Sequence, residues 1–353
     1  MSKADKIANF NPNDLGDPNA NIYGLPFTCE EAEVVIVPVP WDVTVSYSDG
    51  TAGGPEAIFN ASFQVDLFEP SIKDAWKIGI AMEEIPNDLK GRADILREGA
   101  KAYINAITNG VNEAQAELVG KIRDQVNTGS ELLNAWVKER CLGWLNKGKM
   151  VALLGGDHST PFGMMQALAE KHSSFCILQI DAHADLRKAY EGFTYSHASI
   201  MYNALSLPQV SKLVQVGIRD YCQEEAELIH NSNGRVKTFF DRDIKQASYT
   251  GKTWTQQVEE IIATLPENVY ISFDIDGLDP KLCPNTGTPV AGGFEFEQAA
   301  YLIQQVAKSK KIIGCDLNEV SPGEDEWDAN VGARMLFRMC NLMALSNGKA
   351  THG

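Results

Sequence analysis

Two short acidic motifs place metal-binding side chains two residues apart at the ends of apolar runs. Asp181, His183 and Asp185 follow one run, and Asp274 and Asp276 close another. Side chains two residues apart on a strand point to the same face, so each motif presents its ligands together. Carboxylate oxygens combined with imidazole nitrogens suit manganese, nickel, cobalt, iron or zinc better than magnesium or calcium. The two motifs therefore predict a site for divalent metal ions.

A third motif, Gly-Gly-Asp-His-Ser at residues 155–159, ends the apolar run 150–154 and adds His158 to the candidate ligands. Four Asp and two His side chains would then converge, and unpaired carboxylates at one point repel one another strongly. Two ions roughly 3.5–4 Å apart that share bridging carboxylates fit this set better than one ion does. One Asp-X-Asp or Asp-X-His motif is usually a turn or a cap. Three of them, each after an apolar run, favour a two-metal hydrolytic centre.

The elements that must position these motifs alternate along the chain. A long helical stretch over residues 89–148, expected to break near Thr128 and Gly129, is followed by a regular succession of strands and helices. Such alternation is typical of an α/β protein with a mainly parallel sheet covered by helices. Ligands of parallel sheets lie beyond the carboxyl ends of the strands, where all three motifs occur. Strands are expected at 34–39, 150–154, 175–180, 213–217, 236–240, 268–273 and 311–316, and helices from Pro55 and over 161–171.

Composition limits the classes of protein to which the chain can belong. It has 353 residues, enough for one large α/β domain, and a formal net charge of -16. Since it has no cluster of Lys and Arg, we expect no nucleic-acid partner, and its acidity is compatible with a small cationic substrate. Seven scattered cysteines without a Cys-X-X-Cys pair are typical of a reduced, cytoplasmic protein. No apolar run approaches the length of a membrane span, so we expect neither secretion nor membrane insertion.

The division into domains is simple. Residues 1–30 are polar and rich in Asn, Asp, Pro and Gly, which indicates an N-terminal arm or a packed irregular segment. Residues 31–353 contain no repeat, low-complexity tract or linker and are expected to form a single domain. An arm of this length often contacts a neighbouring subunit, so a homo-oligomer is expected.

In this order, the three motifs resemble those of the ureohydrolase superfamily of arginase, agmatinase and formimidoylglutamase, and the resemblance spans residues 34–343. It implies a three-layer α/β/α fold, often assembled as trimers or hexamers, and hydrolysis of a guanidino or formimino C–N bond. It also implies two divalent metal ions, manganese or nickel, with Asp181 and Asp274 contacting both. One ion would also take His158 and Asp185, and the other His183 and Asp276.

The resemblance also implies two catalytic residues that bind substrate. His197 occupies the place of a proton-shuttling histidine, and an imidazole near its usual pKa of about 6.5 both accepts and returns a proton. Glu319 matches a glutamate that binds the guanidinium group through paired, charge-assisted hydrogen bonds. The nucleophile would be a hydroxide held between the two ions, because metals lower the pKa of bound water from 15.7 to about 7.

Substrate identity depends on fewer residues. Arg187 stands where arginases keep an Asn that holds the amino-acid carboxylate, which disfavours arginine and resembles bacterial agmatinases. The segments 40–47 and 324–334 are similar to the branch that hydrolyses free guanidine, and a bulky Trp41 or Trp327 would restrict the pocket to a small substrate. We therefore expect free guanidine as the leading substrate, with Trp327 among the substrate-binding residues. Agmatine, with Glu191 compensating for Arg187, then 4-guanidinobutyrate, and an inactive metal-binding homologue are the alternatives.

Overall fold

One parallel sheet forms the centre of the protein. The computed structural model describes residues 1–17 and 19–353, so Pro18, in the expected arm, lies outside the described residues. Eight strands of the described chain pair in the order β2-β1-β3-β8-β7-β4-β5-β6, and every neighbouring pair is parallel. The expected α/β class is confirmed. The strands are β1 Val34–Val39, β2 Ile80–Met82, β3 Met150–Gly155, β4 Phe175–Ile180, β5 Val210–Ile218, β6 Val236–Phe240, β7 Asn268–Asp274 and β8 Lys311–Asn318.

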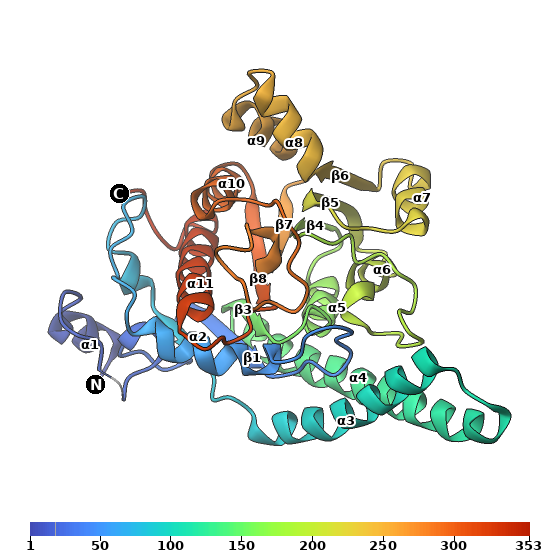
Figure 1. Ribbon diagram of the computed structural model, residues 1–353. Helices are drawn as coiled ribbons and strands as arrows, with labels where there is room; N and C mark the ends of the chain where they lie inside the picture. The colour runs from blue at the N-terminus through green and yellow to red at the C-terminus, as the bar shows by residue number, and fades with distance from the viewer. Residues whose placement is uncertain (18) are drawn as a thin grey trace.

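Helices cover both faces of the sheet and give the three layers (Figure 1). Successive residues of a strand face opposite layers: Ile36 packs in the core beneath α2, α10 and α11, whereas Val37 packs in the core beneath α4, α5 and α6. This burial on both faces explains why the central strands are continuous apolar runs. The helices are α1 Lys3–Asn9, α2 Gly54–Ser62, α3 Asn87–Asn109, α4 Glu113–Asn146, α5 Phe162–Lys171, α6 Ile200–Ala204, α7 Gln223–Asn231, α8 Asp241–Tyr249, α9 Trp254–Ala263, α10 Phe296–Ser309 and α11 Trp327–Ser346.

The long helices α3 and α4 form a hairpin that extends from the body (Figure 1). The helix break that we expected near Thr128 and Gly129 is wrong, because α4 runs through both residues. The chain turns instead after α3, where Asn112 caps α4 and exchanges hydrogen bonds with Gln115. A Cβ atom at Gly129 would lie 2.4 Å from Cδ1 of Leu96 in α3. The glycine therefore permits close packing between the two helices and does not end either.

The first thirty residues are partly packed onto the body. After α1, the side chains of Ile22, Tyr23, Leu25 and Phe27 are buried in the core beneath α2, α10 and α11. All seven cysteines are free. Within residues 1–17 and 19–353, no helix combines the length and the apolar character needed to span a membrane.

Candidate metal centre

The three motifs meet at the carboxyl edge of the four central strands. β3, β8, β7 and β4 are consecutive neighbours in the sheet. His158 follows β3, the segment 181–185 follows β4, Asp274 ends β7 and Glu319 follows β8. Parallel strands end at the same edge, so residues more than a hundred positions apart in sequence become neighbours there.

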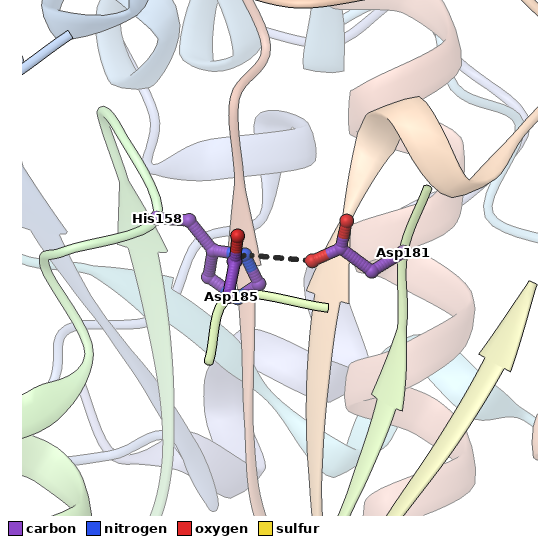
Figure 2. A group of neighbouring side chains, drawn as sticks. All are labelled: His158, Asp181 and Asp185. Carbon is purple, nitrogen blue, oxygen red and sulfur yellow. Dashed lines mark ion pairs between the residues drawn. The ribbon is translucent and has the colours of Figure 1, made fainter. Parts of the chain in front are cut away.

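The first ligand group consists of His158, Asp181 and Asp185 (Figure 2). Nδ1 of the His158 ring lies 3.0 Å from Oδ2 of Asp181 and 3.1 Å from Oδ2 of Asp185. Oδ2 of Asp274 lies 3.2 Å from the same nitrogen. Three buried carboxylates thus point at one imidazole nitrogen, which has no hydrogen-bond partner of suitable geometry in the described chain.

The second ligand group consists of Asp181, His183 and Asp276, so Asp181 belongs to both groups. Nδ1 of His183 lies 2.9 Å from Oδ2 of Asp276 and 3.7 Å from Oδ1 of Asp181. The structure therefore brings all six expected ligands together, with Asp181 between the two groups and Asp274 beside His158. Asp274 belongs to neither group, and the division of the six ligands between two ions stays a prediction.

Backbone amides fix the orientation of the carboxylates. Oδ1 of Asp181 accepts a hydrogen bond from the N–H of His183, and Oδ1 of Asp276 accepts one from the N–H of Ala182. Oδ1 of Asp274 accepts one from the N–H of Asp276. One oxygen of each carboxylate is held by the backbone, and the other is directed at an imidazole nitrogen.

The local electrostatics favour a bound cation. Burial, with the negative charge of Asp181, raises the pKa of Asp185 to about 7, and burial with the charges of Asp276 and Asp181 raises the pKa of Asp274 well above its usual value. Burial alone would lower the pKa of His158, but the carboxylates of Asp181, Asp185 and Asp274 raise it far above 6.5. A pair of divalent ions would remove this repulsion, and carboxylate oxygens together with imidazole nitrogens suit such ions. The residues thus fit two such ions.

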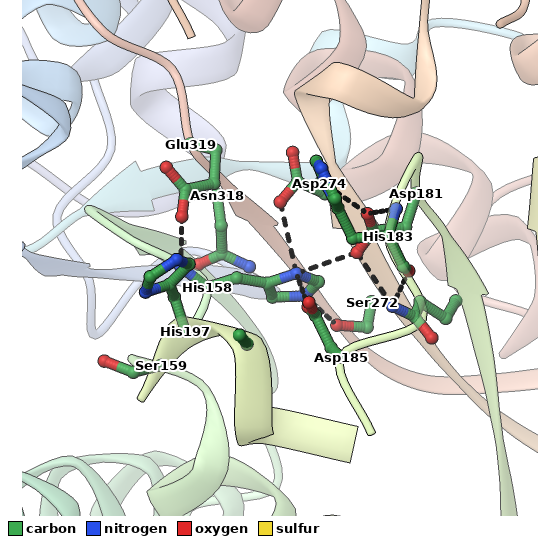
Figure 3. Close-up of polar contacts among 12 residues, drawn as sticks. His158, Ser159, Asp181, His183, Asp185, His197, Ser272, Asp274, Asn318 and Glu319 are labelled. Atoms are coloured by element: carbon green, nitrogen blue, oxygen red, sulfur yellow. Dashed lines mark hydrogen bonds and ion pairs between the residues drawn. The ribbon is translucent and has the colours of Figure 1, made fainter. Parts of the chain in front are cut away.

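The ligand groups open into a cavity of about 150 Å³, which His197 and Glu319 also line (Figure 3). A carboxylate oxygen of Glu319, Oε1, accepts a hydrogen bond from the backbone N–H of His158 at 2.9 Å. The other oxygen, Oε2, is buried without a hydrogen-bond partner in the described chain. Burial and the charge of Asp157 raise the pKa of Glu319 well above its usual value, so a cationic group beside Oε2 would be stabilised.

His197 also lines the cavity and is held by its backbone. Its N–H donates to Oγ1 of Thr44 at 3.3 Å, and its ring meets the Tyr190 ring edge-on. Burial, assisted by the positive charge of His183, lowers the pKa of His197 to about 3. The imidazole is therefore neutral at pH 7, and its pKa is below the value that we expected from the sequence.

Neither Trp327 nor Trp41 lines the cavity, although we expected one of them to restrict it. Trp327 does not line the cavity; it is half exposed at the start of α11, and its Nε1 donates to the carbonyl of Lys281. Trp41 is buried and borders a separate groove of about 720 Å³ between α3 and α4, which contains none of the six ligands. Trp327 is therefore not retained among the proposed substrate-binding residues. The local pattern could not reveal this, because the direction of each indole depends on distant elements.

Several cavity residues escaped the sequence analysis. Ser46, Tyr190 and Thr288 line the cavity, and Asp220 and Tyr221 complete its mouth. Ser46 belongs to the segment 40–47, which the sequence indicated only as a whole, and the other four residues occur in loops without a periodic pattern.

Ser272 contacts His158 from outside the two ligand groups, and the sequence indicates its position. Oγ of Ser272 lies 2.9 Å from Nε2 of His158 and donates to Oδ1 of Asp316. Ser272 precedes Asp274 by two positions on β7, so strand periodicity places the two side chains on one face.

The chain is similar to several known proteins over most of its length. The model of the arginase family matches residues 32–341. The chain is 32% identical over 319 residues to the N(1)-aminopropylagmatine ureohydrolase of Thermus thermophilus, covering 90% of this chain and 93% of that protein. It is 29% identical to the agmatinase of Bacillus anthracis, covering 87% and 90% of the two chains. The crystal structure of the agmatine ureohydrolase of Thermoplasma volcanium has a similar fold, with a TM-score of 0.69, 23% identity, and 98% and 99% of the two chains covered.

Proposed function

The chain belongs to the arginase family and is a metal-dependent ureohydrolase, and on that premise we propose that it hydrolyses free guanidine to urea and ammonia. The observation that carries this proposal is the size of the cavity beside the ligand groups. Its volume of about 150 Å³ is well below the range of roughly 300–1,000 Å³ of sites for larger ligands. Free guanidinium is the smallest cation that offers the guanidino group, and it needs no further pocket.

Glu319 is the proposed anchor of the substrate. A planar guanidinium presents pairs of N–H donors, and a carboxylate accepts two of them in parallel. Oε2 of Glu319 is buried and unpaired in the described chain, and Gly287 leaves space beside it, since a Cβ there would come within 3.0 Å of this oxygen. These contacts support binding of the cation with its carbon near the ligand groups.

His197 is the proposed proton carrier. Its imidazole lines the cavity beside the ligand groups, from where it would accept a proton during attack on the guanidinium carbon and return it to the departing nitrogen. Thr44 holds the His197 backbone, and Tyr190 restricts the ring. Two divalent ions bound to the six ligands would supply activated water at neutral pH, which bulk solution does not provide. Manganese and nickel both suit this set of oxygen and nitrogen donors.

Agmatine is the second candidate, and a specific observation favours it. Asp220 lies at the mouth of the cavity with its side chain exposed, where it would attract a distant ammonium group. The similarity to an agmatinase and to an N(1)-aminopropylagmatine ureohydrolase also favours a longer amine. Arg187 is an argument against agmatine. It lines the same cavity with its guanidinium over the Tyr190 ring and would repel an ammonium group.

The decisive experiment is urea release by protein loaded separately with manganese and nickel. Guanidine, agmatine, N(1)-aminopropylagmatine, 4-guanidinobutyrate and arginine would be compared at equal concentrations, with chelated protein and the Glu319→Gln variant as controls. The expected result is release from guanidine with a kcat/KM above that of every other substrate. A higher kcat/KM with either amine would replace guanidine with that amine, and no release from any substrate would favour an inactive homologue.

The seven free cysteines support our further proposal that the protein works in the reducing cytoplasm.

A further inference from the structure

A row of polar side chains, two of them buried, crosses the three neighbouring strands β4, β5 and β6. Thr238 of β6, Gln215 of β5 and Gln179 of β4 are directly paired in register. Both glutamines are fully buried. Parallel strands covered on both faces are normally apolar, and a buried amide needs hydrogen-bond partners for all its polar atoms. The two buried glutamines therefore need hydrogen-bond partners that an apolar core does not provide.

Each residue of this row donates to the next, and the row ends at a metal ligand. Oγ1 of Thr238 donates to Oε1 of Gln215, and Nε2 of Gln215 donates to Oε1 of Gln179, both at 2.7 Å. Nε2 of Gln179 then donates to Oδ2 of Asp181 at 2.7 Å. This is the oxygen that lies 3.0 Å from the ring nitrogen of His158.

The direction of the row is fixed by chemistry. Nε2 of Gln179 also donates to the carbonyl of His183, and Nε2 of Gln215 also donates to the carbonyl of Ala184. Carboxylates and carbonyls only accept, so rotating either amide by half a turn would set oxygen against oxygen. The amide hydrogens of both glutamines are all used, and only a donor such as the Thr238 hydroxyl satisfies the last oxygen.

The row therefore holds the segment 181–185, which carries three of the six ligands. It orients the carboxylate of Asp181 and fixes two successive carbonyls just before Asp185, whose backbone has a positive φ of 55°. A non-glycine residue keeps such a conformation only when its surroundings hold it there. We propose that Gln179, Gln215 and Thr238 are positioning residues that set the affinity of the centre for its metal ions, acting from as far as the edge strand β6.

The test is the dissociation constant for Mn²⁺, measured by equilibrium dialysis with metal analysis on the full chain. Gln179→Leu is expected to weaken binding about 10–100-fold, as outer contacts of metal ligands do. Thr238 lies two strands from Gln179, roughly 10 Å away. Thr238→Val is therefore expected to weaken Mn²⁺ binding by only about 2–10-fold. Valine keeps the shape and strand preference of threonine, so this variant should fold even if Gln179→Leu does not.

Two controls separate positioning from general stability. Thr238→Ser retains the hydroxyl and is expected to restore the affinity. Ser211→Ala removes a hydroxyl that donates to the carbonyl of Phe175 and has no link to the row, so it should leave the affinity unchanged. The low-temperature electron paramagnetic resonance spectrum of the Mn²⁺-loaded protein gives a second readout, in which Gln179→Leu should weaken the coupling between the two ions.

An unchanged dissociation constant in both Gln179→Leu and Thr238→Val, even with lower thermal stability, would overturn the proposal. So would equal losses in Thr238→Val and Thr238→Ser. The inference rests on the binuclear centre of the proposed function and not on its substrate. If the unmodified protein bound neither Mn²⁺ nor Ni²⁺, the proposed function would fail as well, whereas unchanged affinity in the variants would count against the row alone.

Discussion

The expected ligand residues favour metal binding and lower the stability of the metal-free fold. Asp185 and Asp274 are buried among other carboxylates, and both have raised pKa values because burial and neighbouring negative charges disfavour ionisation. Polar groups that are unfavourable without a ligand are typical of functional sites, where stability is exchanged for activity. This exchange can be measured at a single residue.

Asp185→Asn is expected to lower the affinity for Mn²⁺ by more than about 100-fold, beyond the usual loss for outer contacts. At about pH 8, where Asp185 with its pKa of about 7 is mainly ionised, the same change should raise the thermal midpoint of the metal-free protein by about 1–3 °C, because a neutral amide removes a buried charge. Metal analysis and calorimetry on chelated protein measure the two effects. Asp243→Asn, in the exposed first turn of α8, is the matched control. It should change neither the affinity for Mn²⁺ nor the thermal midpoint of the metal-free protein. A less stable metal-free Asp185→Asn protein would contradict the repulsion that we infer.

Glu319→Gln is expected to keep both metal ions and to lower kcat/KM for the preferred substrate by about 30–150-fold, or roughly 2–3 kcal/mol. The amide retains the shape of the side chain but loses the charge opposite the guanidinium. Kinetics at saturating Mn²⁺ measure this loss, and Glu324→Gln, an exposed residue of the same loop, is the control. Full turnover by Glu319→Gln would refute the role of Glu319.

At the scale of elements, glycines decide how closely the helices around the centre approach. Gly163 in α5 faces α4, where an added Cβ would lie 2.3 Å from the carbonyl oxygen of Asn134 and 2.8 Å from Cβ of Val137. Gly143 in α4 is exposed, and an added Cβ would meet no atom within 4 Å. The sequence does not distinguish these two helical glycines.

Gly163→Ala is expected to destabilise the fold by about 1–3 kcal/mol, since backbone atoms of α4 must move to admit the methyl group. Gly143→Ala is expected to stabilise it by about 0.5–1 kcal/mol, because alanine has the higher helix propensity and nothing obstructs it. Chemical denaturation of the two variants under identical conditions compares them directly. Equal effects in the same direction would show that helix propensity, and not contact between α4 and α5, controls both positions.

At the scale of the whole molecule, metal content and pH should act together on stability. In the metal-free fold His158 has a pKa well above 6.5, Asp185 has one of about 7, and Asp274 and Glu319 have pKa values well above their usual ones. These groups hold protons in the folded state that the unfolded chain releases at lower pH. Their contribution to stability is therefore present at low pH and is lost as the pH rises through the folded-state pKa values. His197, with its lowered pKa, changes its charge below this range.

Chelated protein is accordingly expected to lose about 1–3 kcal/mol of stability between about pH 6 and about pH 8. The metal-loaded protein should keep its stability over this range, because deprotonated ligands bind metal more tightly. Thermal unfolding of both forms across this range provides the measurement, and the gap between their midpoints should widen with pH. Parallel curves for the two forms would contradict the expectation.

A homo-oligomer, as trimers or hexamers, stays a prediction at this scale. Light scattering on the full chain measures the assembly.

The sequence by itself determined the class of fold and the chemistry of the centre. Apolar runs that alternate with helical segments lead to a parallel sheet, and metal-binding residues at the ends of these runs must lie at its carboxyl edge. Both conclusions depend on local patterns, because strand periodicity fixes which side chains share a face. The six expected ligands were recognisable for this reason, and the structure brings them together at four neighbouring strands.

Only the tertiary structure decided features that depend on partners distant in sequence. Gly129 resembles a helix breaker until the packing of α3 against α4 is known, and Trp327 resembles a pocket residue until its indole is found on the surface. The contact between Gln179 and Gln215 arises from the register of two strands whose residues lie 36 positions apart. No local pattern encodes such pairings, because burial, close approach and hydrogen-bond partners arise only when separate elements are packed together.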